Sequence, residues 1–537
     1  MKYFLTFLCL GLMLSCNQKN ENRAHQLGVV NLEVSGNEAA KAHFKKGLLL
    51  LHSFEYTDAR EAFEAAETAD PDMAMAYWGQ AMTFNHSIWF EQDFEQATAC
   101  LDRMHNRAGL KADSDLEKSL INAVELLYQK EKPKPQRDLE YSAYLGDLHE
   151  QFPENQEITA FYALSLLGTV SEGRDYEIYG KAAEMAKKVL KSNPEHPGAL
   201  HYLIHSYDDP DHARLALEAA DAYAIVAPDA AHALHMPSHI YVAMGMWDKV
   251  VASNEDSYGA SLNRMERKKL SNDARGYHSF HWLQYGYLQQ GRAAEAATMA
   301  LNLNDYIKET PSKRGRSHLV FLKGTYLVES GDWQHPVAEI PVEVEDLNIV
   351  VRGQYAFTEG MQAFSEKNKE KLASTIADLE KSLNREAVLV DNLAKGYSGC
   401  TNLDRETANK TDLQLTQVMI WQLKALQAWL SEDTPKTESF LRQAVTLEDQ
   451  ISYSYGPPVI QKPAHELYAD WLLAQNRNGE ALQEYKHTLK KAPKRSRSLK
   501  GAMEAAISLE NDELALKFNS DLQDNLVSSP GPNDQRS

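Results

Sequence analysis

The chain has 537 residues, of which 56 are lysine or arginine and 76 are aspartate or glutamate, so its formal net charge is −20. This acidic balance disfavours nucleic acid as a partner, because phosphate contacts require a basic surface, and it disfavours broad docking onto anionic lipid. The length would suit three or four globular domains, but a single array of repeats can also be this long.

The N-terminus predicts export. Lys2 precedes a mostly apolar run of 12 residues from Tyr3 to Leu14, which is too short to span a bilayer and is typical of a signal peptide over residues 1–15. The following Cys16 comes directly after a serine, and the whole stretch resembles the lipobox of bacterial lipoproteins. That resemblance implies cleavage before Cys16 and acylation of its thiol, as with palmitate. It also implies a membrane anchor in the cell envelope, expected to be the outer membrane. An ordinary secretory signal with a chance cysteine is the alternative.

The next segment, residues 16–38, is polar and non-periodic, which predicts a flexible tether. Apart from the acylated residue, only Cys100 and Cys400 are predicted in the mature chain. They are far apart and have no CxxC spacing, so the sequence predicts neither a disulfide framework nor a thiolate metal site.

The segment from Phe44 to Pro71 has the spacing of a tetratricopeptide-like repeat, which is two antiparallel helices in about 34 residues. Within it, Phe63 and Ala66 lie three residues apart on one helix face. Degenerate copies recur and are marked by Ala216, Ala220, Tyr223 and Pro228, by Gly291, Ala293 and Ala296, by Gly324, Gly331 and Trp333, and by Ala481, Tyr485 and Pro493. The sequence therefore predicts an all-α fold, a superhelical solenoid of degenerate tetratricopeptide-like helix pairs with a concave inner surface.

Two solenoid segments are predicted, over residues 39–335 and 353–523. Between them, residues 336–352 predict an extended linker, because Pro341 interrupts an alternating apolar pattern. The C-terminal residues 524–537, rich in serine, proline, glycine and asparagine, predict a disordered tail.

Histidines recur on the predicted inner face of three adjacent repeats. His201 and His205 are four residues apart, as are His235 and His239, so each pair shares one helix face, and the two pairs are 34 residues apart. The full series, which we call the histidine ladder, is His201, His205, His232, His235, His239, His278 and His281. Seven of the 19 histidines thus fall on one strip, which is more than scatter would give.

The ladder predicts either a metal site or a polar groove. Neutral imidazole is a good ligand for zinc, copper, nickel or iron, and a His-x-x-x-His pair on a helix is a common half-site. A divalent transition metal such as zinc is therefore a candidate cofactor, held by His201, His205, His235 and His239. The alternatives are a groove whose rings hydrogen-bond to one another, to the backbone or to water, and metal-free acid–base chemistry.

Other side chains are predicted beside the same groove. His86 follows the first helix of the second repeat, and Tyr285 continues the ladder register. Glu466 and Asp470 occupy equivalent positions in a late repeat and could complete a metal shell if the superhelix curled back, although Glu466 also suits the start of a helix. The acidic turn at residues 207–212 predicts helix capping, with calcium as the alternative.

These motifs resemble a group of bacterial tetratricopeptide proteins. The shared stretches are His196-Pro197-Gly198 with His201 and His205, then His235-Met236-Pro237-Ser238-His239-Ile240, and later Gly456-Pro457-Pro458 with Lys462-Pro463-Ala464-His465-Glu466. The resemblance covers nearly the whole mature chain and implies the fold and a candidate site, but no activity.

Two functions follow from the sequence. The first is a membrane-anchored envelope scaffold that binds a protein, peptide or glycan in its concave groove, an expectation that rests on analogy of fold. The second is a metal-dependent enzyme or a metal-handling protein that uses the histidine ladder. A purely structural lipoprotein is a third possibility.

Overall fold

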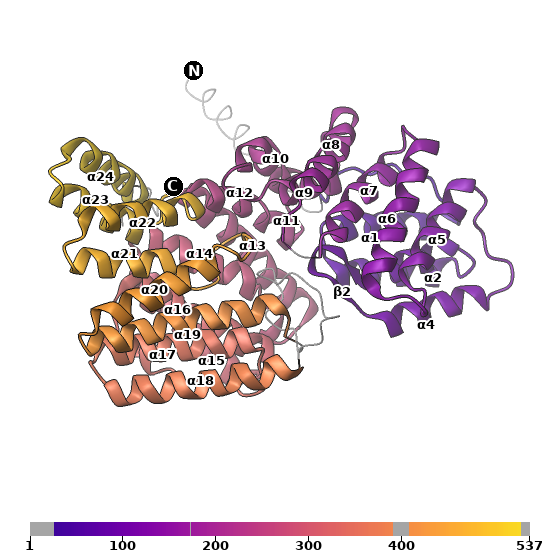
Figure 1. The fold of residues 1–537 in the computed structure, drawn as a ribbon. Coiled ribbons are helices and arrows are strands. Elements are labelled where there is room, and N and C mark those ends of the chain that lie inside the picture. Colours follow the sequence, from indigo (N-terminus) through magenta and orange to yellow (C-terminus); the bar gives the residue numbers. More distant parts are fainter. Residues whose placement is uncertain (1–25, 172, 390–407, 528–537) are drawn as a thin grey trace, which may run out of the picture.

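The structure, a computed structural model, describes residues 26–171, 173–389 and 408–527. The predicted signal peptide, the predicted lipidation site Cys16, Cys400 and residues 528–537 of the predicted tail lie outside these residues. Residues 524–527 of that predicted tail belong to the last helix, which ends at Val527. Within the described residues the chain is almost entirely helical (Figure 1). This confirms the all-α prediction.

The helices follow one another as antiparallel neighbours that pack in sequence order. The N-terminal group is α1 (Glu38–His52), α2 (Tyr56–Ala69), α3 (Ala74–Met82), α4 (Phe94–His105), α5 (Asp115–Leu127), α6 (Lys134–Gln151), α7 (Gln156–Thr169) and α8 (Tyr176–Ser192). The middle group is α9 (Pro197–Ser206), α10 (Leu217–Val226), α11 (Ala231–His235), α12 (Pro237–Met244), α13 (Trp247–Lys268), α14 (Tyr277–Gln289), α15 (Ala293–Glu309) and α16 (Lys313–Ser330).

The C-terminal group is α17 (Ile349–Ser365), α18 (Lys369–Leu389), α19 (Lys410–Leu430), α20 (Thr434–Glu448), α21 (Ala464–Ala474), α22 (Asn478–Lys491), α23 (Ser496–Ser508) and α24 (Asp512–Val527). Short 3-10 turns lie at Ser87–Trp89, Ala213–Ala216, Asn272–Ala274 and Pro336–Glu339. In the described residues, the strand content is one antiparallel pair, β1 (Asn85–His86) and β2 (Glu91–Gln92). No helix among these residues is long and apolar enough to cross a membrane.

The first repeat shows why the sequence pattern forms stacked helix pairs. The ring of Phe63 on α2 is fully buried between two glycines, Gly47 on α1 and Gly79 on α3. A Cβ atom added at Gly47 would lie 2.7 Å from the Phe63 ring, and one added at Gly79 would lie 2.3 Å away. The glycines therefore let three helices approach a single aromatic ring, as the repeat spacing predicts.

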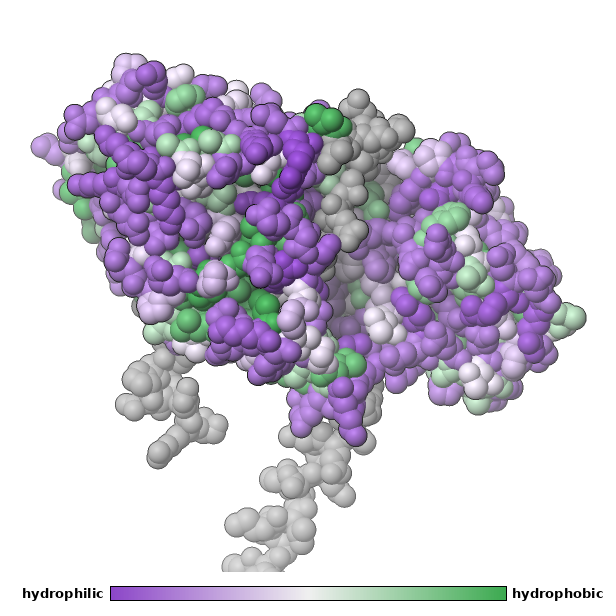
Figure 2. Space-filling view, turned by 90° about the horizontal axis from the view of Figure 1, so that it is seen from below, coloured by the Kyte–Doolittle hydropathy of each residue, from purple (hydrophilic) through white to green (hydrophobic). Residues whose placement is uncertain are grey.

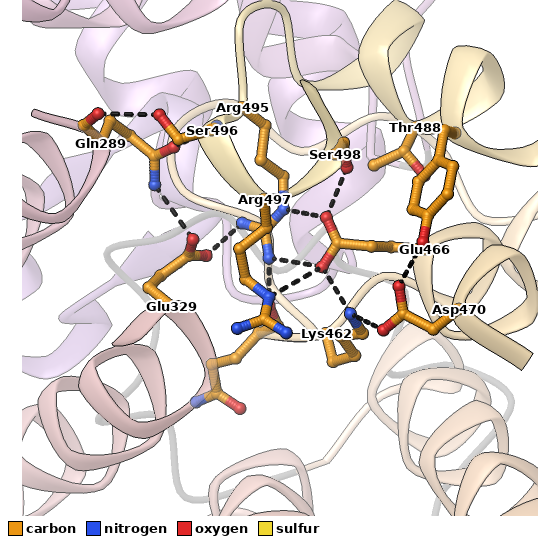
Figure 3. A network of polar contacts seen from close by, with 12 residues as sticks. Gln289, Glu329, Lys462, Glu466, Asp470, Thr488, Arg495, Ser496, Arg497 and Ser498 are labelled. Atoms are coloured by element: carbon orange, nitrogen blue, oxygen red, sulfur yellow. Dashed lines mark hydrogen bonds and ion pairs between the residues drawn. The ribbon is translucent and has the colours of Figure 1, made fainter. Parts of the chain in front are cut away.

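The C-terminal helices return to the middle of the solenoid. The indole Nε1 of Trp247 on α13 donates to the carbonyl of Lys494 at 3.1 Å, and Ser496 at the start of α23 bonds Gln289 on α14. The buried guanidinium of Arg495 lies between Glu466 on α21 and Glu329 on α16 (Figure 3). The inner surface of the middle repeats is thus covered by the chain's own C-terminal part.

The predicted tether is partly bound to the folded body. Residues 26–37 have no helix, yet Val30 is buried and the amide of Val29 donates to the carbonyl of Glu195 at 2.9 Å. Further along, the amide and hydroxyl of Ser35 donate to the Glu117 carboxylate. The predicted tether from Val29 to Asn37 is therefore part of the folded body.

The linker predicted at residues 336–352 begins with a short 3-10 turn and continues as extended chain. The backbone carbonyl of Ile340 accepts a hydrogen bond from the buried ammonium of Lys323 at 3.0 Å. Helix α17 starts at Ile349 with Asn348 as its N-cap, a few residues earlier than the sequence suggested.

Candidate metal centre

Six of the seven ladder histidines meet in the interior. His201 and His205 lie on α9, His232 and His235 on α11, His239 on α12, and His278 on α14. Pro237 interrupts the hydrogen bonds between α11 and α12, but Met236 keeps helical backbone angles, so His235 and His239 still share one face. The helices that the sequence register expects to be neighbours are therefore the ones whose histidines meet.

The rings form a continuous series of contacts. Ring centroids lie 4.9 Å apart for His201 and His205, 5.0 Å for His201 and His232, and 5.2 Å for His205 and His239. The series continues at 5.2 Å between His235 and His239 and at 4.5 Å between His235 and His278. We call these six residues the histidine cluster.

The cluster is buried, whereas the sequence placed it on an open groove. His201 is 0% exposed and His205, His235 and His239 are at most 4% exposed. Aromatic side chains from the N-terminal, middle and C-terminal parts of the chain cover it. These side chains, which we call the aromatic shell, are Phe54, Trp89, Trp282 and Tyr455.

The loop before α21 supplies Tyr455. Its ring lies 4.6 Å from that of His239 and 5.9 Å from that of His205. The adjacent Gly456 has φ +94° and packs so closely on Trp282 that an added Cβ would lie 2.2 Å from that ring. The Gly456-Pro457-Pro458 motif therefore lets the loop that carries Tyr455 pack closely against Trp282 over the cluster.

Four of the rings are held through Nδ1 by an oxygen acceptor. His201 Nδ1 donates to the backbone carbonyl of His52 at 2.8 Å. His205 and His239 both donate to one oxygen of Asp208, at 3.2 and 3.1 Å. Because these acceptors require hydrogen on Nδ1, each Nε2 carries a bare lone pair that faces the cluster.

His235 is held in the same way by Asn254. Its Nδ1 lies 2.7 Å from the Asn254 side-chain oxygen, and the amide nitrogen of Asn254 donates to the Val250 carbonyl. That second bond fixes the orientation of the amide, so His235 must be the donor. Metal-binding histidines in proteins are commonly oriented by such an acceptor on the other ring nitrogen.

The Nε2 atoms have few partners of their own. Within the described residues, the buried Nε2 atoms of His205, His235 and His278 have no hydrogen-bond partner. The Nε2 atoms of His201 and His232 lie 3.2 Å apart. A buried polar atom left without a partner costs about 1–3 kcal/mol, so several at one place indicate a missing ligand.

Burial keeps the rings neutral. It lowers the pKa of His201, His232, His235 and His278 well below the usual value, and repulsion between neighbouring rings lowers it further. The pKa of His239 is lowered to about 4, mainly by burial and despite the Asp208 carboxylate. Neutral imidazoles are the form that binds a metal ion.

Asp208 is itself supported by Arg174, whose guanidinium lies 2.6 Å from it. Burial would raise the pKa of Asp208, but Arg174 and the two histidines hold it well below its usual range. The acidic turn at residues 207–212 therefore has two roles. Asp209 caps the turn, as predicted, by accepting the amides of Asp211 and His212, while Asp208 serves the histidine cluster.

The remaining predicted residues lie elsewhere. His281 points away, and its Nε2 lies 3.1 Å from the Thr325 hydroxyl. His86 stacks on Tyr56 with ring centroids 4.0 Å apart, next to the aromatic shell. Tyr285, Glu466 and Asp470 belong to the network around Arg495 and do not complete a metal shell.

In that network, Arg495 Nε lies 2.7 Å from Glu466, Lys462 Nζ lies 2.9 Å from Glu466, and Tyr485 donates to Asp470 at 2.7 Å (Figure 3). Burial opposes ionisation of Glu466, yet the cations Arg495 and Lys462 hold its pKa well below the usual value. Its carboxylate therefore serves as the internal counter-ion that joins α21 to α23.

Sequence reasoning missed a second buried group. The Glu157 carboxylate lies 2.8 Å from His52 Nε2 and 3.2 Å from His196 Nε2, and all three side chains are fully buried. His52 Nδ1 contacts the Tyr202 hydroxyl, and His196 Nδ1 accepts the amide of Ala199, so the ring nitrogens are all occupied. The group fixes the His52 carbonyl that orients His201. In the sequence, the only indication of this buried group is that His196 begins the His196-Pro197-Gly198 stretch.

A small cavity borders the cluster. Its lining includes Arg174, Tyr179, His205, Asp208 and Tyr455. It has room for a ligand of only a few atoms and carries a cationic side chain, so a large substrate does not fit beside the rings in this conformation.

No protein-family model and no curated protein matches the sequence. Similar solved structures include human IFIT1 in a dimer with m7Gppp-AAAA, at 11% identity and TM-score 0.31, covering 92% of this chain and 91% of that one. Yeast Tom70 shares 10% identity, covers 91% and 85% of the two chains, and has TM-score 0.27. The P58(IPK) TPR domain shares 14% identity, covers 88% and 99%, and has TM-score 0.18. The chain is a tetratricopeptide-type helical solenoid.

Proposed function

We propose that this protein is a membrane-anchored metalloprotein of the cell envelope, which binds transition metal ions at the histidine cluster. One observation carries the proposal. The buried Nε2 atoms of His205, His235 and His278 have no hydrogen-bond partner, while the Nδ1 atoms of four rings in the cluster are held by oxygen acceptors. The membrane anchor is supported by the residues around Cys16.

The chemical type of the ligand atoms, which are all imidazole nitrogens, decides which metal ions can bind. Six imidazole nitrogen ligands suit zinc, copper, nickel or iron, and do not suit calcium or magnesium, which prefer oxygen. The aromatic shell keeps water away from these ligands, which strengthens binding and limits what can reach the ion. A metal-handling role, or chemistry on a molecule of a few atoms, fits this enclosure better than hydrolysis of a polymer.

Elemental mass spectrometry tests the proposal directly. The chain from Asn17 onward, purified without an affinity tag, is expected to contain stoichiometric copper, zinc, nickel or iron. The His201→Asn/His235→Asn variant should fold, by circular dichroism, and contain none. Absence of metal from the parent, even after reloading with each of the four ions, would refute a metal centre.

The anchor has its own test. Cells supplied with labelled palmitate should incorporate the label into the parent chain and not into the Cys16→Ser variant. The parent should also fractionate with membranes, whereas the variant should be recovered in the soluble fraction. Equal labelling of both chains would show that Cys16 is not the acylated residue.

A scaffold that binds a protein, peptide or glycan is the second candidate. A mostly apolar pocket beside the loop of Tyr455 favours it, with Leu415, Val459, Ile460 and His465 in its lining. Figure 2 also shows a hollow between the N-terminal helices and the rest of the molecule. A photo-crosslinker at Val459, compared with one at exposed Lys500, would report a partner in this pocket. Equal background at both positions would argue against one.

A further inference from the structure

We infer that the histidine cluster holds two metal ions, each bound by its own set of three imidazoles. This inference rests on the proposed function and specifies how many ions bind and which residues hold each one. The first set, trio A, is His201, His205 and His232, and the second, trio B, is His235, His239 and His278. In each trio, one ligand nitrogen from each ring lies within 4.8 Å of the other two.

A tetrahedral ion takes four ligands, so one such ion cannot use all six rings. Imidazole nitrogens bind zinc at about 2.0–2.1 Å, so two ligands of one tetrahedral ion lie about 3.3 Å apart. The Nε2 atoms of His201 and His232 are 3.2 Å apart, which matches that separation before any metal is added. Between the trios, ring centroids lie 6.1 Å apart for His232 and His235 and 5.2 Å apart for His205 and His239. In the closer pair, the two Nδ1 atoms are bonded to Asp208.

The two trios are built in the same way, from two rings on one helix face and a third ring on the next helix of the stack. Trio A takes two rings, one helical turn apart, from α9 and a third from α11, whereas trio B takes two from α11 and α12 and a third from α14. In both, the two rings on one face have their Nδ1 atoms fixed by oxygen acceptors. The third ring, His232 or His278, is half-buried and closes the set from the next helix of the stack.

Asp208 joins the two trios. It accepts hydrogen bonds from His205 of trio A and His239 of trio B on the same oxygen. These three residues also lie close enough together to hold an ion themselves. That arrangement is disfavoured, because the Nδ1 atoms and the carboxylate already bond one another and Arg174 pairs with Asp208 at 2.6 Å. Asp208 is thus a positioning residue shared by both sites.

Three protein ligands leave each ion with a fourth position for water or an external ligand. The six rings bring no negative charge, and Asp208 is paired with Arg174, so two divalent ions would add positive charge that the protein does not neutralise. This favours a small anion as the additional ligand, and the small cavity bordered by Arg174 is where such an anion fits.

Native mass spectrometry of the metal-free chain from Asn17 onward, titrated with zinc chloride, counts the ions. The parent is expected to bind two zinc ions, and His232→Asn and His278→Asn are each expected to bind one. The double variant should bind none. His281→Asn is the matched control, because His281 lies on the same helix as His278 but outside the cluster, and it should bind two.

The outcomes separate the two proposals. One ion in the parent would overturn the two-ion inference and leave the proposed metal centre standing. Loss of both ions from either single variant, in a chain that still folds by circular dichroism, would overturn the division into two trios. No ion in the parent at any zinc concentration below the millimolar range, with copper equally unbound, would overturn both.

Discussion

The guanidinium of Arg174 lies 2.6 Å from the carboxylate of Asp208, and both side chains are almost fully buried. This ion pair lies where the two histidine trios meet, because Asp208 bonds His205 of trio A and His239 of trio B. It ensures that Asp208 is ionised and can accept hydrogen bonds from two imidazoles at once. The residues that orient the metal ligands can therefore be tested apart from the ligands themselves.

Asp208→Asn is expected to weaken zinc binding by about 10- to 100-fold, the usual cost of removing an outer partner of metal-bound histidine. The amide can present a nitrogen to the rings and so leave one of them in the wrong tautomer. Competition with a chromophoric chelator measures the affinity. Asp211→Asn, at an exposed position in the same turn, is the control and should bind as the parent does. A folded Asp208→Asn chain with unchanged affinity would contradict the positioning role.

Gly456→Ala is expected to displace the loop that carries Tyr455. The new Cβ would lie 2.2 Å from Trp282, and the φ of +94° strains any residue other than glycine. We expect a loss of about 1–3 kcal/mol in the free energy of unfolding and faster release of bound zinc to a chelator. Gly479→Ala on α22 has no atom within 4 Å of its new Cβ and should leave release unchanged. Equal release rates from both variants would show that the loop does not close the site.

Arg495→Leu is expected to destabilise the docking of α21 to α24 by about 3–5 kcal/mol, because it leaves the buried Glu466 and Glu329 without their shared cation. Hydrogen exchange over residues 464–527 should rise, while exchange in α1 to α8 stays as in the parent. Lys500→Ala removes an exposed cation from the same helix and serves as the control. Unchanged protection of residues 464–527 would mean that apolar contacts alone hold these helices.

His318, which lies outside the cluster, predicts a pH dependence of folding. Burial, followed by the charge of Arg314, lowers its pKa from the usual 6.5 to about 3. Below pH 6.5 the unfolded chain therefore binds a proton that the folded chain excludes, and the free energy of unfolding falls as the pH falls. The loss is about 1.4 kcal/mol per pH unit for this ring, and it continues until the pH reaches the folded pKa.

Urea unfolding of the metal-free parent and of His318→Gln at pH 7.5, 6.5 and 5.5 checks this. Below pH 6.5, the slope of unfolding free energy against pH should be smaller in the variant by about 1.4 kcal/mol per unit. His43→Gln, at an exposed position, controls for the loss of an imidazole as such. Parallel slopes for the parent and His318→Gln would show that the buried ring does titrate in the folded chain.

The fold could be predicted from sequence because its determinants are local. The spacing of Gly47, Phe63 and Ala66 describes one helix pair, and the same packing unit recurs along the chain. The meeting of the histidines also depends on short-range spacing, because helices one repeat apart in the sequence pack side by side. This is why six of seven ladder residues meet in the structure. His281 was misplaced because α14 turns that position toward Thr325 on α16.

The rest of the site depends on contacts between distant segments, which a repeat register does not contain. Tyr455 covers rings more than two hundred residues away in sequence. The Glu157 group pairs His52 with a carboxylate 105 residues distant. The sequence left two roles open for Glu466: part of a metal shell if the superhelix curled back, or a favourable residue at a helix start. The chain does curl back, but Glu466 pairs with Arg495 and Lys462, and the repeat register does not contain those contacts.

Because Tyr455 belongs to the last quarter of the polypeptide, the order of synthesis has a consequence for loading. All six imidazoles leave the ribosome well before the segment that covers them. Ions can therefore enter a half-assembled chain from the open side, and the arrival of the final helices then seals them in. A mature molecule stripped of its ions would have to loosen its C-terminal helices to refill. Loading during biogenesis should accordingly be much faster than exchange in the finished protein.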